Sequence, residues 1–313
     1  MHVIGAGSLG TLFAAYLAKG GIEVSVVVKP GQVTSMGSRG LAVQRTSAEK
    51  SFQVANVGFH DDLAACKDGD VIVVAVKAFD VEHVLDELRC KVKLEPSRQA
   101  LCLVQNGIGI EHIARSAFPS MPLLRVSTTN GALLVRPAVV SHTGVGETFV
   151  GFWDEQRPST GEAILDNMVA AFKASGLPVE KHGHMHQKVF EKCIVNAGIN
   201  AVGAMFRVPN GKILEVPQLR EISRHLTTEA VAVAKATGSI KTFDGHAAVQ
   251  AVLEKTAAKR NSMLQDIEKG RKTEIDFING AFASRGKALG IDVPWNEVFV
   301  DAIHGFEALS RHG

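Results

Sequence analysis

The distribution of apolar and polar residues gives the two halves of the chain different characters. In the first half, short apolar runs alternate with helical patterns, as in chains whose strands and helices alternate. The strand-like runs are His2–Ile4, Glu23–Val28, Asp70–Val76, Ala100–Val104, Leu123–Thr129, Ala138–Ser141 and Thr148–Phe152. The helical patterns are Ser8–Lys19, Val81–Leu88, Ile110–Ala117 and Ser159–Ser175, and an extended piece follows at Leu177–Glu180. Continuous apolar runs are typical of strands buried on both faces, so an α/β domain with a parallel sheet is predicted.

From His186 onward only helical patterns remain. They cover Phe190–Phe206, Pro217–Thr237, Phe243–Ala258, Gln265–Gly270, Ile275–Leu289 and Pro294–Leu309, with turn residues at Val208–Gly211. The polar segment Lys181–His186 separates the two halves, so we predict an α/β domain over residues 1–183 and an all-α domain over residues 184–313. The histidines of that segment, His182, His184 and His186, lack a fourth ligand at a set spacing. We interpret them as part of a solvated linker and predict no metal site.

A glycine-rich turn follows the first predicted strand. Residues 5–10 read GAGSLG and fit the pattern G-x-G-x-x-G, with a helix and a second strand directly after it. In dinucleotide-binding proteins such glycines allow a tight turn and a close approach to the pyrophosphate, which the helix N-terminus binds. The sequence therefore predicts a Rossmann-type domain whose cofactor contacts include Gly5, Gly7, Ser8, Leu9 and Gly10.

The end of the second strand indicates which dinucleotide binds. An acidic residue there would bind the ribose 2′-hydroxyl of NAD, but Val26–Gly31 contains no acid and the strand ends at Lys29. A cation at this point favours the 2′-phosphate of NADP. A solvated lysine at a strand end is the alternative interpretation.

Two further predicted strands end in polar residues. Lys77 follows Asp70–Val76, and Asn106 follows Ala100–Val104. Ligands bind at the carboxyl edge of such sheets, so both are candidate cofactor or substrate contacts. Alternatively, Lys77 is simply exposed and Asn106–Gly107 is only a turn.

The helix at Phe190–Phe206 carries an unusual polar stripe. Lys192, Asn196 and Asn200 interrupt an apolar sequence at steps of four residues, which places them on one helical face. A lysine and two amides in apolar surroundings need polar partners, which either a small ligand or a neighbouring helix could supply.

Composition excludes some functions. The 34 Lys and Arg residues nearly balance the 32 Asp and Glu residues, and there are only two Trp and one Tyr, so neither a dedicated nucleic-acid binder nor a base-stacking surface is indicated. Four cysteines without C-x-x-C spacing suggest free thiols, with Cys102 and Cys193 buried, in a reducing compartment. We recognise no signal peptide and no run approaching the length of a membrane span, so a cytoplasmic location is expected.

Taken together, these segments resemble the ketopantoate reductases (2-dehydropantoate 2-reductases). The resemblance spans nearly the whole chain. It is carried by GAGSLG at 5–10, VKAFD at 76–80, QNGIG at 105–109, EKCIVNAGINAV at 191–202, PNGKI at 209–213, SMLQDI at 262–267 and TEIDFING at 273–280. It implies that NADPH reduces the C2 ketone of 2-dehydropantoate to (R)-pantoate, a step towards pantothenate and coenzyme A.

The resemblance also implies roles for individual residues. Lys192 matches the general acid, and the expected substrate contacts are Asn106, Asn196, Asn200, Ser262 and Glu274. Lys77, Asn106 and Glu274 are expected at the cofactor, and Lys29 stands where the family has a basic residue, often Arg, for the 2′-phosphate.

Other readings of the sequence stay open. A reductase of another 2-oxo acid, a dehydrogenase of a β-hydroxy acid or sugar phosphate, and a non-catalytic NADP-binding sensor are the alternatives. The helical half also permits a homodimer, and no nucleic-acid or membrane partner is expected.

Overall fold

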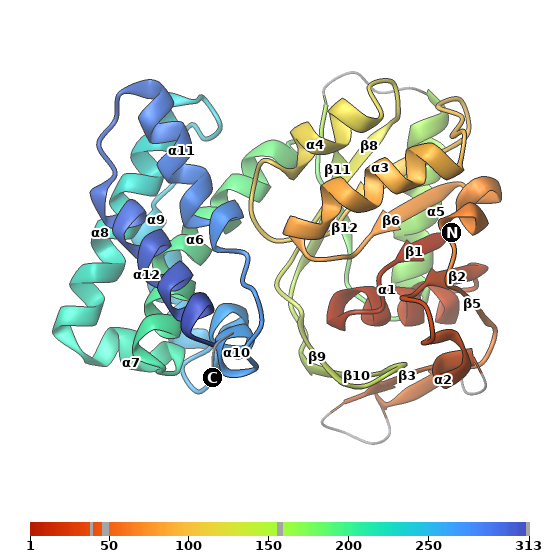
Figure 1. Ribbon diagram of the computed structural model, residues 1–313, viewed down its shortest axis with the longest axis horizontal. Helices are drawn as coiled ribbons and strands as arrows, with labels where there is room; N and C mark the ends of the chain where they lie inside the picture. Colours follow the sequence, from red (N-terminus) through yellow and green to blue (C-terminus); the bar gives the residue numbers. More distant parts are fainter. Residues whose placement is uncertain (38–39, 46–49, 155–158, 311–313) are drawn as a thin grey trace. The chain divides into compact units, whose positions relative to one another are not determined.

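The computed structural model describes residues 1–37, 40–45, 50–154 and 159–310. The chain divides into two compact units (Figure 1). The first unit contains residues 1–105 and 110–185, and the second contains residues 106–109 and 186–313. The short segment 106–109 therefore belongs with the helical part of the chain, although it lies within the α/β part of the sequence.

The first unit is built on an eight-stranded sheet in the order β12-β11-β8-β7-β6-β1-β2-β5. Its strands are β1 (His2–Ile4), β2 (Val24–Val27), β5 (Val57–His60), β6 (Val71–Val74), β7 (Ala100–Leu103), β8 (Leu123–Thr128), β11 (Thr148–Phe152) and β12 (Glu180–Lys181). The pairs from β5 through β8 are parallel, whereas β11 runs antiparallel to β8. Every residue of β6 and β7 is buried, which accounts for their continuous apolar sequences.

Helices cover this sheet in two groups. Helix α1 (Ser8–Lys19) packs beside α5 (Ser159–Ala174), and α3 (Val81–Lys91) packs beside α4 (Ile110–Ala117). The connection from β1 to β2 runs one way along the sheet, and those from β6 to β7 and β8 run the other way. Because such crossovers are right-handed, α1 lies on the face opposite to α3 and α4 (Figure 1).

A second sheet of four strands, in the order β4-β3-β10-β9, packs against α1. It consists of β3 (Leu41–Gln44), β4 (Phe52–Val54), β9 (Gly131–Arg136) and β10 (Val139–Gly144), and a short helix, α2 (Val33–Gly37), precedes it. The sequence predicted only one of these strands, as Ala138–Ser141. Ala138 is instead a turn residue with φ 64°, and β10 begins after it.

Within the residues that the structure describes, the second unit contains helices joined by turns and no strand (Figure 1). Its helices are α6 (Met185–Phe206), α7 (Asn210–Glu215), α8 (Pro217–Ala236), α9 (Gly245–Lys255), α10 (Ser262–Glu268), α11 (Asn279–Leu289) and α12 (Pro294–Ser310). Two predictions were wrong in detail. The turn residues at 208–211 lead into α7, and the helix expected from Ile275 begins only at Asn279, after a 3₁₀ turn at Ile275–Phe277.

Helix α6 is the long apolar element of the second unit. It has 22 residues and a mean hydropathy of 1.2 in its most apolar window, so by length and composition it could cross a membrane, contrary to the sequence-based expectation. In that window, 72% of the helix is buried inside the protein, as in the core helix of a globular unit. Gly198 and Gly203 allow this burial, because a Cβ would lie 2.4 Å from Thr227 Oγ1 and 2.3 Å from Asn261 Nδ2, respectively.

Candidate active site

The glycine-rich turn joins β1 to the N-terminus of α1. Gly5 has φ 103°, which favours glycine, and a Cβ on Gly10 would lie 2.0 Å from the Gly5 carbonyl oxygen. Gly7 is the N-cap residue and contributes no capping side chain, and no acidic residue stands in the first turn of α1. A Cβ on Gly7 would meet nothing within 4 Å. The residues present therefore fit a pyrophosphate, with the N-terminal amides of α1 as donors and Gly7 as the point of close approach.

Ser8 also has a structural role that the sequence did not reveal. Its hydroxyl accepts a hydrogen bond of 3.0 Å from the backbone N–H of Leu134 in β9. The second sheet is thereby hydrogen-bonded to the first residue of α1.

Two predicted lysines follow strands that flank β1. Lys29 is exposed two residues after β2, and Lys77 is half-buried as the N-cap of a short 3₁₀ helix after β6. Since β2 and β6 both run parallel to β1, their carboxyl ends and the glycine-rich turn share one sheet edge. The structure thus groups Gly5–Gly10, Lys29 and Lys77 at the edge where doubly wound sheets bind ligands.

A short glycine-containing turn follows strand β7. Asn106–Gly109 belongs to the second unit, where the Ile108 N–H donates to the Phe277 carbonyl at 2.9 Å. Gly107 has φ 86°, and a Cβ there would lie 2.3 Å from the same carbonyl oxygen. Asn106–Gly107 therefore does form a turn, and this turn presents Asn106 to Lys192 and Glu274. That Asn106 contacts cofactor or substrate stays a prediction.

Three predicted residues form one hydrogen-bonded chain in the second unit. Lys192 Nζ donates to Asn106 Oδ1 at 2.8 Å, and Asn106 Nδ2 donates to Glu274 Oε2 at 3.4 Å. Glu274 is 7% exposed and precedes the 3₁₀ turn at Ile275–Phe277, whose last N–H bonds back to the Glu274 carbonyl. An ammonium, an amide and a carboxylate are thus brought together, with the Asn106 amide bonded to both charged groups.

The rest of the polar stripe continues along α6. Asn196 is half-buried and Asn200 is 5% exposed, and within the described residues neither amide forms a hydrogen bond. Ser262 is exposed at the start of α10, where the Asn261 side chain caps the helix by accepting from the Leu264 N–H at 2.9 Å. Asn261 lies against Gly203, so Ser262 starts α10 near the C-terminal half of α6. Asn261 was a missed residue, and its position directly before a helical pattern was the available signal.

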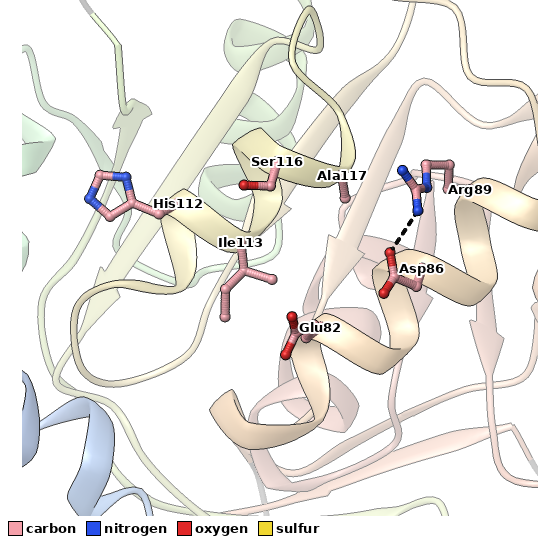
Figure 2. Close-up of a pocket in the computed structure, with 7 residues that line it drawn as sticks. All are labelled: Glu82, Asp86, Arg89, His112, Ile113, Ser116 and Ala117. Carbon is pink, nitrogen blue, oxygen red and sulfur yellow. Dashed lines mark hydrogen bonds and ion pairs between the residues drawn. The ribbon is translucent and has the colours of Figure 1, made fainter.

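A surface hollow lies apart from the predicted site residues. A hollow of about 340 Å³ lies between α3 and α4, lined by Glu82, Asp86, Arg89, His112, Ile113, Ser116 and Ala117 (Figure 2). None of them is a predicted site residue, and Arg89 is paired with Asp86 across an exposed helical turn. Among the described residues, no three His, Cys, Asp or Glu side chains are arranged to hold a metal ion. The His184 N–H donates to His182 Nδ1, and the His182 ring packs edge-on against Phe149.

The fold and the glycine-rich turn define a two-unit protein of the dinucleotide-binding type. Its sequence matches two family models: ketopantoate reductase PanE/ApbA over residues 1–155 and the C-terminal part of ketopantoate reductase PanE/ApbA over residues 184–307. The chain is 32% identical to the 2-dehydropantoate 2-reductase of Archaeoglobus fulgidus, and the alignment covers 98% of each chain. The chain belongs to the ketopantoate reductase family, and the predicted resemblance and fold class are confirmed.

Solved structures agree with this assignment. A PanE/ApbA family ketopantoate reductase from Ralstonia eutropha JMP134 superposes with a TM-score of 0.87 at 27% identity, covering 100% of both chains. D-mandelate dehydrogenase, solved with NADH and anilino(oxo)acetate, superposes with a TM-score of 0.85 at 22% identity and covers 99% of both chains. The similarity to D-mandelate dehydrogenase shows that this chain and that enzyme have the same fold.

Proposed function

We propose that this protein is an oxidoreductase that uses NADPH to reduce the C2 ketone of 2-dehydropantoate to (R)-pantoate, a step in the synthesis of pantothenate and coenzyme A. The observation that carries this proposal is the full-length similarity to proteins named 2-dehydropantoate 2-reductase. The hydrogen-bonded chain Lys192–Asn106–Glu274 supports it, because it supplies an acid and a hydroxyl acceptor of the kind the reaction needs.

The first unit is proposed to hold the cofactor. The N–H groups of Ser8, Leu9 and Gly10 would bind the pyrophosphate, and Lys29 would bind the 2′-phosphate, since no acidic residue between Val26 and Gly31 would repel it. Lys77 stands at the same sheet edge and is proposed as a further contact. When bound, NADPH supplies the hydride for the reduction.

The second unit is proposed to hold the substrate. Reduction places negative charge on the ketone oxygen, and the Lys192 ammonium would stabilise that charge and donate a proton to it. Asn106 holds the ammonium at 2.8 Å and thereby fixes its direction. Asn196 and Asn200 are proposed as neutral donors to the substrate, consistent with the absence of hydrogen bonds on their amides within the described residues.

Glu274 and Ser262 are proposed to recognise the rest of the substrate. The buried carboxylate of Glu274 would accept a hydrogen bond from the substrate's hydroxyl. An analogue without the hydroxyl cannot donate this bond, so the site would favour the hydroxylated substrate. Glu274 is also proposed to lie next to the cofactor, and the Ser262 hydroxyl would bind the substrate from the start of α10. We further propose that residues 184–313 provide the contact surface of any homodimer.

The test is to follow NADPH oxidation with 2-dehydropantoate and with 2-oxo acids of similar size that lack the 4-hydroxyl group, repeating each assay with NADH. Efficient turnover with 2-dehydropantoate and NADPH, and poor turnover of the other combinations, is the expected result. Equal turnover of the hydroxyl-free acids would replace the substrate by another 2-oxo acid. Binding of NADPH without turnover of any acid would indicate a sensor and overturn the enzymatic assignment.

A further inference from the structure

A buried ion pair in the first unit lies next to the end of β7. Arg125 of β8 is 1% exposed and Glu111 of α4 is 1% exposed, and Arg125 Nε donates to Glu111 Oε1 at 2.7 Å. Arg125 is a charged residue in a strand whose six residues are all buried. Burying two charges is costly even when they are paired, so the pair is weak evidence of stabilisation and calls for another explanation.

The guanidinium of Arg125 also binds the backbone where the chain leaves the first unit. Its Nη1 donates to the Leu103 carbonyl at 3.3 Å and to the Gln105 carbonyl at 2.8 Å. The Gln105 carbonyl belongs to the peptide group whose nitrogen is that of Asn106. Arg125 therefore fixes the plane of the Gln105–Asn106 peptide, which is the bond that joins the two units at this point.

The Gln105 side chain holds the same strand end from the other side. Its Nε2 donates to the carbonyls of Val74 at 2.8 Å and Val76 at 3.1 Å, which precede Lys77. The orientation of the amide follows from these contacts, because its oxygen in this position would face two carbonyl oxygens. The amide oxygen is left buried without a hydrogen bond among the described residues, so the donor contacts define the position of Gln105.

Glu111 lies close to the point where the chain re-enters the first unit. Only the segment Asn106–Gly109 belongs to the second unit at this point of the chain. Gly107 and Gly109 in this segment have positive φ angles of 86° and 103°. The first unit resumes at Ile110, and Glu111 follows at once in the first turn of α4. Arg125 therefore binds the backbone just before the segment Asn106–Gly109, and its partner Glu111 lies just after that segment.

We infer that Arg125 and Glu111 are positioning residues that set the direction of Asn106, and through Asn106 the position of the Lys192 ammonium. The expected effect on catalysis rests on the proposed function. The expected effect on the backbone of Asn106–Gly109 does not depend on the proposed function. A guanidinium suits this role because its planar fork can bind a carboxylate and two carbonyls at once, which an ammonium cannot do in the same geometry. Active-site groups need such support to keep their productive geometry.

The test uses a variant that removes both charges together, Arg125→Met/Glu111→Leu, because removing one partner would leave a buried, uncompensated charge. Arg125→Lys keeps the charge but loses the fork, and it serves if the paired variant folds poorly. The matched control is Arg115→Met/Asp154→Leu. Arg115 lies in α4, as Glu111 does, but at the end of the helix that is far from residues 106–109. It pairs with Asp154 and donates to the carbonyls of Phe118, Pro119 and Met121.

The first readout is hydrogen–deuterium exchange at residues 106–109, including the Ile108 amide that bonds to the Phe277 carbonyl. We expect exchange there to rise by about tenfold or more in the paired variant, with the strands β1 and β6 unchanged and no such rise in the control. Unchanged exchange at residues 106–109 would overturn the inference, whatever the protein's substrate is.

The second readout is a mutant cycle with Asn106→Ala, measured as kcat/KM for 2-dehydropantoate. If Arg125 and Glu111 act through Asn106, the paired variant lowers kcat/KM by about tenfold to a hundredfold in the wild-type background and by less than about twofold in the Asn106→Ala background. The same loss in both backgrounds would assign the pair to general stability and overturn the inference. A wild-type protein that reduces no 2-oxo acid would refute the proposed function, and the exchange measurement alone would then decide.

Discussion

Lys192 Nζ donates a hydrogen bond of 2.8 Å to Asn106 Oδ1, although the two residues stand 86 positions apart in the sequence. Asn106 in turn donates towards Glu274 at 3.4 Å. The Asn106 amide thus links the ammonium of Lys192 to the carboxylate of Glu274 within the second unit. This arrangement makes Lys192 the candidate acid and Glu274 the candidate acceptor, and each role leads to a different experiment.

Replacement of Lys192 tests the acid. In Lys192→Ala, kcat should fall by about 10²–10⁴-fold, because proton donation to the developing oxyanion is lost. NADPH binding, measured by fluorescence titration, should stay close to that of the wild type. Lys188→Ala is the control, since Lys188 lies one helical turn earlier in α6 and pairs with Glu191. A Lys192→Ala protein with near-normal kcat would remove the assignment.

Replacement of Glu274 tests substrate recognition. Glu274→Gln should lower kcat/KM for 2-dehydropantoate by about tenfold to a hundredfold, the value of a hydrogen bond to a charged acceptor. Turnover of a 2-oxo acid without the hydroxyl should change little, because that acid makes no such bond. Asp276→Asn provides the comparison, as Asp276 is an exposed carboxylate nearby that bonds to His304 at 2.8 Å. Equal losses with both acids would show that Glu274 does not read the hydroxyl.

Lys29 tests the choice of cofactor. Removing its charge in Lys29→Ala should raise KM for NADPH about tenfold and leave KM for NADH within about twofold, since only NADPH carries the 2′-phosphate. Lys67→Ala is the matched control, because Lys67 is exposed in the segment that precedes β6 and so lies at the opposite end of the strands. If both KM values rose together, Lys29 would have a general role in binding instead.

Several of these site features could be predicted from local sequence. The glycine turn and the start of α1 depend on neighbouring residues, and the stripe Lys192–Asn196–Asn200 follows from helical spacing alone. The second sheet was missed because its strands are short and because β4 and β9 contain no fully buried residue. The interruption at Ile275–Phe277 was missed because its residues are compatible with a helix, and only tertiary contacts of Phe277 with Gly107 and Ile108 explain it.

The Arg125–Glu111 pair shows a different limit. An arginine within the apolar run of β8 signals that a buried partner exists, since a guanidinium without one would be very costly in that position. Local sequence cannot say which of the 32 acidic residues is the partner, or that backbone carbonyls at the end of β7 share the guanidinium. For the same reason, the membership of Asn106–Gly109 in the helical unit could not be foreseen.

The four free cysteines give a prediction that needs no substrate. Cys66, Cys102 and Cys193 are buried, and burial raises the pKa of the Cys66 and Cys102 thiols to about 12, whereas Cys90 is exposed. Because the thiolate is the reactive form, a thiol reagent at neutral pH should modify one cysteine rapidly in the native protein and all four after denaturation. The Cys90→Ser variant should lose the rapid phase. A rapid phase of the same size in that variant would mean that a buried thiol is accessible.

His2 predicts how stability depends on pH. Its ring packs against Gly69, its Nδ1 is buried without a hydrogen bond among the described residues, and burial lowers its pKa, with the nearby N-terminal ammonium and His60 acting in the same direction. The unfolded chain therefore binds the proton first, near pH 6.5, so the free energy of unfolding should fall as the pH drops through and below that value. The His2→Gln variant lacks this titration, and its Tm should decline less than that of the wild type between about pH 8 and about pH 5. His83→Gln, at an exposed position in α3, should decline in parallel with the wild type. Parallel curves for the wild type and His2→Gln would show that the His2 ring takes up a proton in the folded protein as readily as in the unfolded chain.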